Sequence, residues 1–184
     1  TPVQVVERLR RLNCRYTAVP SPGKRLDGSR ESVRKYIADI NKAGAVLREA
    51  GHVLTYHNHH IEFQKFDGKI LLDMIYNGTD PRNLQGELDT YWVQYGGGCP
   101  VDWCRKLKNR LPLLHMKDYG IDENKEVKIK EIGRGNLDWK PIIAAAEEAG
   151  CEWFFVEQDN NWTNNDPFES LRISFQFIRD NLCG

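Results

Sequence analysis

Two hydrophobic patterns alternate along the chain: stretches of helical length with a period near 3.6 residues, and short apolar runs. The clearest helical stretch lies between Ser29 and Gly51, where apolar residues recur on one face. The pattern predicts helices over residues 1–12, 29–51, 70–76, 99–110, 138–149 and 166–182. The apolar runs predict strands over residues 16–19, 52–59, 84–89, 111–118 and 153–159. The last predicted helix carries the apolar residues Leu171, Phe175, Ile178 and Leu182.

This alternation of strands and helices predicts an α/β fold. Right-handed crossovers then place the strands in a parallel sheet with helices on both sides. We expect five strand–helix units, with no low-complexity linker between them. The connection from Tyr119 to Leu137 is longer than the others, and Val127 and Ile129 alternate with lysines in it. A small hairpin or a lid is expected there.

The composition is that of one globular domain. A chain of 184 residues can bury one sizeable core, and two independent domains would be a stretch. Its 26 basic and 26 acidic residues are interspersed, so no basic face for nucleic acid is expected. No apolar run approaches the roughly 20 residues that span a bilayer, and no membrane partner is expected. Five scattered cysteines without a CxxC pair favour reduced thiols and a cytoplasmic location.

The last four apolar runs each end in residues that can bind a metal ion. These residues are His57 and His59, Glu87 and Asp89, His115 with Lys117 and Asp118, and Glu157 and Asp159. The carboxyl ends of parallel strands lie on one face of the sheet, and residues two apart on a strand point to the same side. Two imidazoles and two carboxylates that converge there suit a divalent cation of intermediate hardness, such as Mn²⁺, Co²⁺ or Zn²⁺.

Each of these residues also has an ordinary structural explanation. A histidine at a strand end is more often a hydrogen-bonded structural residue than a ligand, and an acidic residue there often caps the next helix. His52 and His60 do not fit the pattern and are interpreted as surface residues. The metal-site hypothesis depends on four consecutive units that end in the same chemistry.

Five motifs follow one another between the second predicted strand and the last. They are Tyr56-His-Asn-His-His-Ile-Glu-Phe63, Glu87-Leu-Asp-Thr-Tyr-Trp92, Leu114-His-Met-Lys-Asp118, Gly133-Arg-Gly-Asn-Leu-Asp-Trp139 and Val156-Glu-Gln-Asp159. In this order they resemble the sugar phosphate isomerase/epimerase family, which belongs to the xylose isomerase-like TIM barrels. The resemblance runs from about Tyr16 to the end of the chain.

The resemblance implies a metal site held by four strand-end ligands, usually Glu, Asp, His and Glu. Asp89, His115 and Glu157 match the last three. The first falls at His57, where many relatives carry Glu, so this ligand departs from the family's pattern. The expected cofactor is one divalent metal ion, with Mn²⁺ in first place and Co²⁺, Mg²⁺ or Zn²⁺ as the other choices.

The reaction that we expect is proton transfer at a carbon next to a sugar carbonyl, through an enediolate. Glu157 is both a ligand and the candidate base, and His59 or Glu62 would take over proton transfer where the family's two-glutamate arrangement is lost. Lys117, two residues beyond His115, is expected to face the same cavity and to hold an oxyanion or a phosphate. The substrate is then a small sugar or sugar phosphate.

A TIM barrel needs eight strand–helix units, and this chain supplies five. In the family's order, the strand over 16–19 is the fourth and the strand over 153–159 is the eighth. We therefore expect residues 1–184 to form a single barrel domain that lacks its N-terminal units. An upstream segment, another chain or a second copy would then cover its two exposed edges.

Three other functions stay open. The family includes dehydratases, so one alternative is a metal-dependent dehydratase or lyase that acts on a related sugar or keto-sugar. Endonuclease IV shares the barrel type, so the second alternative is a metal-dependent phosphodiesterase. That activity would need more ligands and a basic groove than the sequence shows. The third alternative is a non-catalytic binding domain, which metal analysis of the protein would separate from the enzymes.

Overall fold

The sheet is built from five parallel strands, as the sequence predicts. The computed structural model describes residues 1–183 and contains β1 (Tyr16–Val19), β2 (Val53–His57), β5 (Gln85–Asp89), β6 (Leu113–Met116) and β9 (Trp153–Val156). Their hydrogen-bonded order is β1-β2-β5-β6-β9, which begins and ends with the strands predicted as edges. The prediction of an incomplete (βα) barrel is therefore confirmed. By their contacts the residues form two compact units, Thr1–Glu87 and Leu88 onward.

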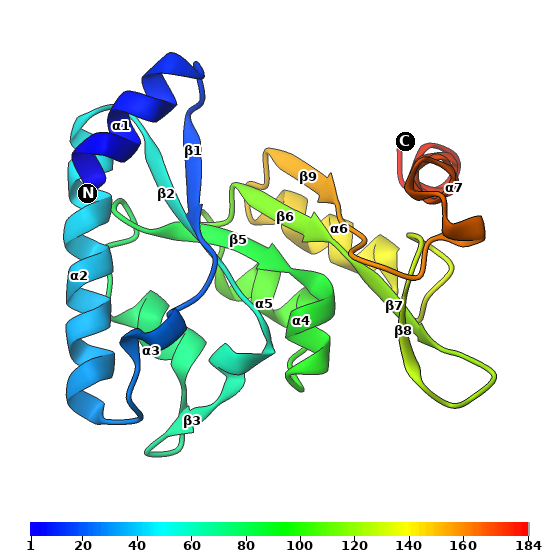
Figure 1. The fold of residues 1–184 in the computed structure, drawn as a ribbon, viewed down its shortest axis with the longest axis horizontal. Helices are drawn as coiled ribbons and strands as arrows, with labels where there is room; N and C mark the ends of the chain where they lie inside the picture. Colours follow the sequence, from blue (N-terminus) through cyan, green and yellow to red (C-terminus); the bar gives the residue numbers. More distant parts are fainter. Residues whose placement is uncertain (184) are drawn as a thin grey trace. The chain divides into compact units, whose positions relative to one another are not determined.

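The first unit contains β1, β2 and most of β5 (Figure 1). Its helices are α1 (Pro2–Arg11), α2 (Arg30–Glu49) and α3 (Leu71–Asn77), and its shorter elements are η1 (Gly23–Arg25), η2 (His60–Phe63), β3 (Lys65–Phe66) and β4 (Lys69–Ile70). β2 pairs in parallel with β1 on one side and with β5 on the other. In the second of these ladders His57 pairs with Glu87, which fixes the height of the His57 backbone in the sheet.

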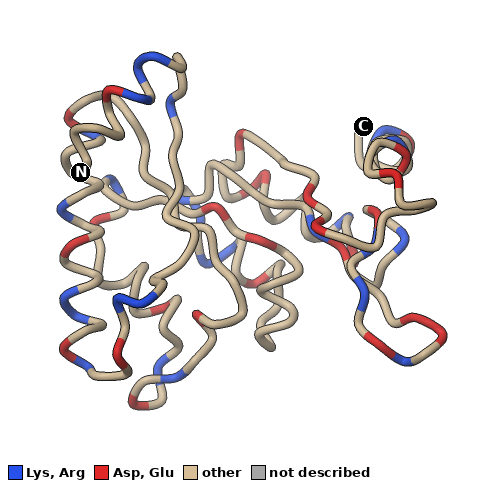
Figure 2. The backbone as a smooth tube through the Cα atoms, in the orientation of Figure 1, with Lys and Arg blue, Asp and Glu red and all other residues tan. Residues whose placement is uncertain are grey.

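α2 confirms the clearest helix prediction. Ser29 caps its N-terminus, because the Ser29 hydroxyl accepts a hydrogen bond from the Ser32 amide at 3.1 Å. The predicted apolar stripe faces the interior, and Val33 and Leu47 are almost wholly buried. Gly44 is required on this face, since a Cβ there would lie 1.9 Å from the carbonyl oxygen of Asn83. The outer side of α2 alternates acidic and basic residues along its length (Figure 2).

The second unit contains the parallel pair of β6 and β9, in register from Leu113↔Trp153 to Met116↔Val156. Its helices are α4 (Thr90–Tyr95), α5 (Pro100–Lys106), α6 (Trp139–Glu148) and α7 (Pro167–Asn181), with η3 (Thr163–Asn165) before the last. The long connection after β6 is an antiparallel hairpin of β7 (Asp118–Ile121) and β8 (Val127–Lys130). The hairpin expected from the alternation of Val127 and Ile129 with lysines is therefore confirmed.

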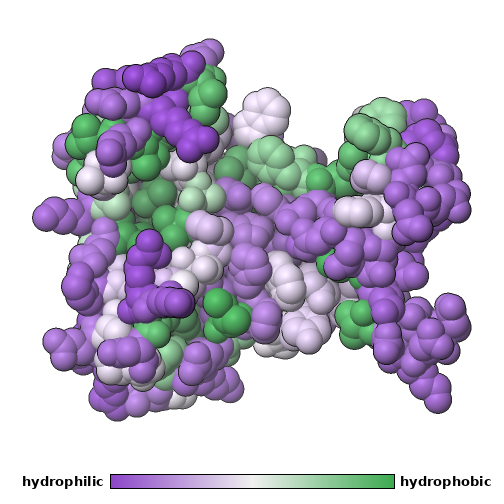
Figure 3. All heavy atoms as spheres, in the orientation of Figure 1, coloured by the Kyte–Doolittle hydropathy of each residue, from purple (hydrophilic) through white to green (hydrophobic). Residues whose placement is uncertain are grey.

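α7 differs from an ordinary amphipathic helix. Its buried residues are Ser170 and Ser174, whereas Phe168, Leu171 and Phe175 are exposed to 79%, 46% and 62%. Figure 3 shows hydrophobic atoms at the surface in the region of this helix. Among residues 1–183, no helix has the length and apolar character needed to cross a membrane.

Candidate metal centre

Three of the predicted ligands come together in the second unit. Asp89 ends β5, His115 lies in β6, and Glu157 directly follows β9. One ligand atom from each of the three lies within 4.8 Å of those from the other two. The ladder of β6 and β9 produces this meeting, because the Glu157 amide continues it by donating to the Met116 carbonyl at 3.0 Å. The His115 Nδ1 and a Glu157 carboxylate oxygen are hydrogen-bonded to each other.

Asp89 is the most deeply buried of these ligands. One carboxylate oxygen accepts a hydrogen bond from the Trp92 amide at 3.0 Å and so caps the N-terminus of α4. Burial raises the pKa of Asp89 to about 7, and the nearby Lys117 ammonium offsets only part of this rise. A cation bound beside Asp89 would therefore favour its ionised form.

Lys117 places a positive charge among the ligands. Its Nζ lies 2.6 Å from Asp159 Oδ2, 3.3 Å from Glu157 Oε1 and 3.8 Å from Asp89 Oδ2. The same atom lies 5.2 Å from the centre of the Trp92 ring. Although burial by itself lowers the pKa of this ammonium, the three carboxylates outweigh burial and raise it. Lys117 is therefore a buried, charged residue that faces the ligand cluster.

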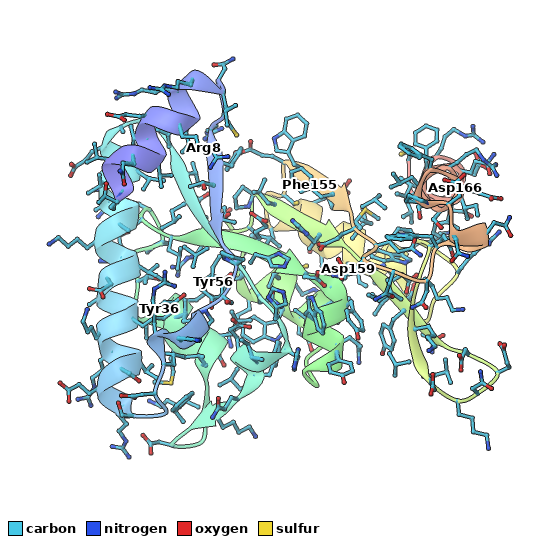
Figure 4. All side chains as sticks on the ribbon, in the orientation of Figure 1. Arg8, Tyr36, Tyr56, Phe155, Asp159 and Asp166 are labelled. Carbon is cyan, nitrogen blue, oxygen red and sulfur yellow. The ribbon has the colours of Figure 1, made fainter. Side chains whose placement is uncertain are left out.

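Glu157 behaves in the opposite way to Asp89. The hydrogen bond from His115 and the charge of Lys117 lower the pKa of Glu157 to about 2, although burial opposes this change. Glu157 is therefore ionised at neutral pH. Asp159, two residues further on and labelled in Figure 4, also forms an ion pair with Lys117, so the last motif supplies two carboxylates to one ammonium.

Asp118 follows Lys117, but its side chain has a different environment. The carboxylate is wholly buried and accepts hydrogen bonds from the amides of Tyr119, Gly133, Gly135 and Leu137, and from the Trp139 indole at 2.7 Å. Gly135 is required there, because a Cβ would lie 2.1 Å from Asp118 Oδ1. Asp118 ends the strand predicted over 111–118, but in the structure it begins β7 and anchors the loop that follows the β7–β8 hairpin.

His57 belongs to the first unit, where it ends β2. Its imidazole is buried and packs edge to face against the His59 ring, with ring centres 4.9 Å apart. His57 Nδ1 lies 3.9 Å from Glu87 Oε1, and the other oxygen of Glu87 accepts a hydrogen bond from Thr55 at 2.7 Å. Glu87 therefore lies next to the candidate ligand as a carboxylate held by β2.

Glu62 lies in the interior of the first unit. One carboxylate oxygen accepts a hydrogen bond from the Tyr56 hydroxyl at 2.9 Å, and the other accepts one from the His59 amide at 2.8 Å. The side chain is wholly buried, and burial raises its pKa. The sequence predicts no role for Tyr56, although this residue is the first of the first motif. Figure 4 labels it. Its spacing of six residues from Glu62 gives no periodic signal that would pair the two.

A cavity of about 530 Å³ opens beside Asp159 in the second unit. Tyr91 and Trp92 line it from α4, residues 127–129 line it from β8, and Asn160 and Asn161 line it after Asp159. The sequence hypothesis did not include the two asparagines. They directly follow the last motif, and this position after a strand that carries a predicted ligand would have indicated a role in the site.

Comparison with known proteins supports the same fold. The family model described as xylose isomerase-like TIM barrel matches residues 3–181. An inosose dehydratase of Geobacillus thermodenitrificans is 28% identical over 163 residues, which are 80% of this chain and 54% of that protein. The chain thus spans about half the length of the curated relatives that it matches.

Solved structures agree with the family match. A sugar phosphate isomerase/epimerase from Parabacteroides distasonis superposes with a TM-score of 0.83 at 24% identity, over 98% of this chain and 62% of that one. A D-psicose 3-epimerase, solved in the presence of D-fructose, superposes with a TM-score of 0.64 at 15% identity, over 98% of this chain and 69% of that one. The resemblance inferred from the five motifs is confirmed.

Proposed function

Because the chain belongs to the xylose isomerase-like TIM barrel family, we propose that it is part of a metal-dependent isomerase or epimerase of sugars or sugar phosphates. The reaction is proton transfer at a carbon next to the substrate carbonyl. The observation that carries the proposal is the cluster of Asp89, His115 and Glu157, with ligand atoms within 4.8 Å of one another. Relatives named as a dehydratase and as an epimerase support an enzyme.

The donor set fits a divalent cation. One imidazole and two carboxylates from separate strands suit Mn²⁺ or Co²⁺. His57 is proposed as the fourth ligand. It pairs with Glu87 across the ladder of β2 and β5, and Asp89 lies two residues beyond Glu87 on the same side of β5. When bound, the cation would supply Lewis-acid polarisation of the substrate carbonyl.

The residues around the cluster have separate roles in this proposal. Glu157, which is ionised, accepts the proton from the substrate carbon and returns it at the neighbouring position or on the other face. Lys117 stabilises the negative charge that develops on the enediolate oxygen, and Asp159 holds Lys117 in place. The rings of Tyr91 and Trp92 and the amides beyond Asp159 give the cavity apolar and hydrogen-bonding surfaces, which together match a polyhydroxy compound.

The first test concerns the metal ion. Elemental analysis after incubation with Mn²⁺ and gel filtration should find about one ion per wild-type chain, and much less in Asp89→Ala and Glu157→Ala. His57→Ala should lower the affinity without changing the other three ligands. Glu123→Ala, at an exposed acidic residue of the β7–β8 hairpin, is the control. Unchanged metal content in Asp89→Ala and Glu157→Ala would refute the site.

The second test concerns the base. With a ketose in D₂O, NMR should show exchange of the hydrogen next to the carbonyl for the wild type. Glu157→Gln should slow this exchange by ~10²–10⁴-fold, the usual cost of losing a general base. Normal exchange in Glu157→Gln would transfer the role to His59.

A dehydratase is the second candidate, and the inosose dehydratase relatives favour it. The first step is the same, because a proton leaves the carbon next to the carbonyl. The hydroxyl on the adjacent carbon then leaves, takes up a proton and departs as water, so a carbon–carbon double bond forms. Product analysis separates the two candidates: an isomerase or epimerase keeps the mass of the substrate, whereas a dehydratase lowers it by the mass of one water.

A further inference from the structure

The carboxyl group of Glu62 is a buried acid without a cation. It has no solvent exposure, and within residues 1–183 no basic side chain lies within ion-pairing distance of it. An isolated buried carboxylate is costly unless hydrogen bonds satisfy its oxygens. Glu62 has such bonds, from the Tyr56 hydroxyl and the His59 amide.

These two bonds connect β2 to the turn that follows it. Tyr56 is the second-last residue of β2, and its own carbonyl accepts a hydrogen bond from the Tyr76 hydroxyl at 3.3 Å. The Tyr56 side chain is wholly buried and donates its hydroxyl to one oxygen of Glu62. The other oxygen of Glu62 holds the His59 amide at 2.8 Å, so the backbone at His59 is tied to the strand.

His59 is in turn in contact with His57. Their rings are 4.9 Å apart at an interplanar angle of 77°, an edge-to-face contact. The ladder with β5 holds the backbone of His57, and the ring of His59 packs against its imidazole. Glu62 holds the backbone that carries the His59 ring, so the place of this ring beside His57 depends on Glu62.

We propose that Glu62 is a positioning residue, which fixes His59 and thereby orients the His57 imidazole for metal binding. The metal part of this inference rests on the proposed function, in which His57 is a ligand. Groups behind a metal ligand typically change metal affinity by 10–100-fold when they are removed.

The geometry separates this role from proton transfer. Both oxygens of Glu62 accept hydrogen bonds inside the first unit, and the side chain is closed to solvent. A glutamine can replace it, because its carbonyl oxygen accepts from the His59 amide while its NH₂ group donates to the hydroxyl oxygen of Tyr56. A methionine has similar length but offers no acceptor to either donor. Glu62→Gln and Glu62→Met are therefore a matched pair.

The metal arm measures Co²⁺ affinity and the visible spectrum of bound Co²⁺. Glu62→Met should weaken binding by ~10–100-fold and change the spectrum, whereas Glu62→Gln should resemble the wild type. His59→Ala should weaken binding like Glu62→Met while leaving Glu62 in place. Glu31→Gln, an exposed acid of α2, is the control. If Glu62→Gln keeps Co²⁺ affinity but loses turnover by ~10²–10⁴-fold, Glu62 is an acid or base and the inference is overturned.

The second arm uses the metal-free protein, so it does not depend on the proposed function. Nuclear Overhauser contacts between the His57 and His59 rings, and slow exchange of the His59 amide, should persist in Glu62→Gln and disappear in Glu62→Met. Their persistence in Glu62→Met would overturn the inference whatever the metal result. A wild type that binds no Co²⁺ would instead refute the proposed function, and loss of the ring contacts would still support the positioning of His57. If Glu62→Met does not fold, Tyr56→Phe, which removes one donor to Glu62 and keeps the His59 ring, provides the comparison.

Discussion

Two carboxylate clusters of this chain are stabilised by opposite means. Around Lys117, three carboxylates share one ammonium, and the pKa of Glu157 falls to about 2. Around Glu62, neutral donors satisfy a lone carboxyl group, and its pKa rises. A cation can compete for the first cluster, because its stability already depends on a positive charge. The second cluster has no such dependence and is suited to holding backbone and rings in place.

Replacing Lys117, the ammonium of the first cluster, should have the largest effect on the free energy of unfolding. In Lys117→Met, Asp89 and Glu157 would remain close together without their shared ammonium. Leaving a buried charge unpaired usually costs 3–5 kcal/mol, and roughly 3 kcal/mol is expected because Glu157 and Asp159 are partly exposed. Urea unfolding in the presence of a chelator measures this loss. Added Mn²⁺ should restore part of the stability, since it replaces the missing charge.

Lys128→Met is the control for that experiment. Lys128 is also ion-paired, to Glu126 at 2.7 Å, but this pair lies on the exposed hairpin. Exposed pairs are worth about 0–1 kcal/mol, so Lys128→Met should change the free energy of unfolding by less than 1 kcal/mol. Equal losses in the two variants would contradict the contrast between a buried and an exposed ammonium.

Asp118 tests how much a buried carboxylate that is held by neutral donors contributes to the free energy of unfolding. Asp118→Ala would remove the acceptor of four amides and the Trp139 indole at once. Each buried donor left unsatisfied costs about 1–3 kcal/mol, and water entering the site would recover part, so a loss of roughly 2–3 kcal/mol is expected. Chemical denaturation measures it, with Glu123→Ala as the exposed control. A loss below 1 kcal/mol would mean that the loop does not depend on Asp118.

The ligand-type residues at the strand ends could be predicted from the sequence, because the spacing of apolar residues and the order of strands and helices can be read directly along the chain. The alternation of elements predicts a parallel sheet, and a parallel sheet brings its carboxyl ends to one face. Asp89, His115 and Glu157 meet as this rule requires. Asp118 and Glu62 have the same residue types, yet they face the interior. The loop donors to Asp118 lie 15–21 residues further along the chain, and the tyrosine that donates to Glu62 lies six residues before it. Neither spacing corresponds to the period of a helix or a strand.

Stability of the metal-free protein should depend on pH in opposite ways for Glu62 and Glu157. The pKa of folded Glu62 lies above its usual value of 4.5, so the folded state keeps a proton that the unfolded chain loses, and stability falls as pH rises above 4.5. The pKa of folded Glu157 is about 2, so its contribution is present above 4.5 and is lost as pH falls towards 2.

Substitution separates the two contributions. Glu62→Gln should reduce the decline above pH 4.5, to which Asp89 also contributes, and Glu157→Gln should reduce the decline below it. One pKa unit corresponds to about 1.4 kcal/mol, and solvent screening reduces the effect at the partly exposed Glu157, so about 1–2 kcal/mol is expected for Glu157→Gln. Urea unfolding with a chelator between pH 3 and 8 gives both slopes. If Glu62→Gln leaves the upper slope unchanged, the buried carboxyl group does not titrate as its environment requires.

The smallest effects are expected at Glu131, where hydroxyl donors meet a buried carboxylate as at Glu62. Glu131 Oε1 accepts hydrogen bonds from Ser170 at 2.7 Å and from Thr163 at 2.8 Å, and although burial opposes it, these bonds lower the pKa. Ser170→Ala should cost about 1 kcal/mol, because Glu131 keeps its other donor. Leu171→Ser, at the next position, should change stability by less than about 0.5 kcal/mol, since Leu171 is 46% exposed. Thermal unfolding of both variants measures the difference. A larger loss in Leu171→Ser would mean that another surface covers the apolar side of α7 in solution, and that hydropathy rather than hydrogen bonding determines how this helix packs.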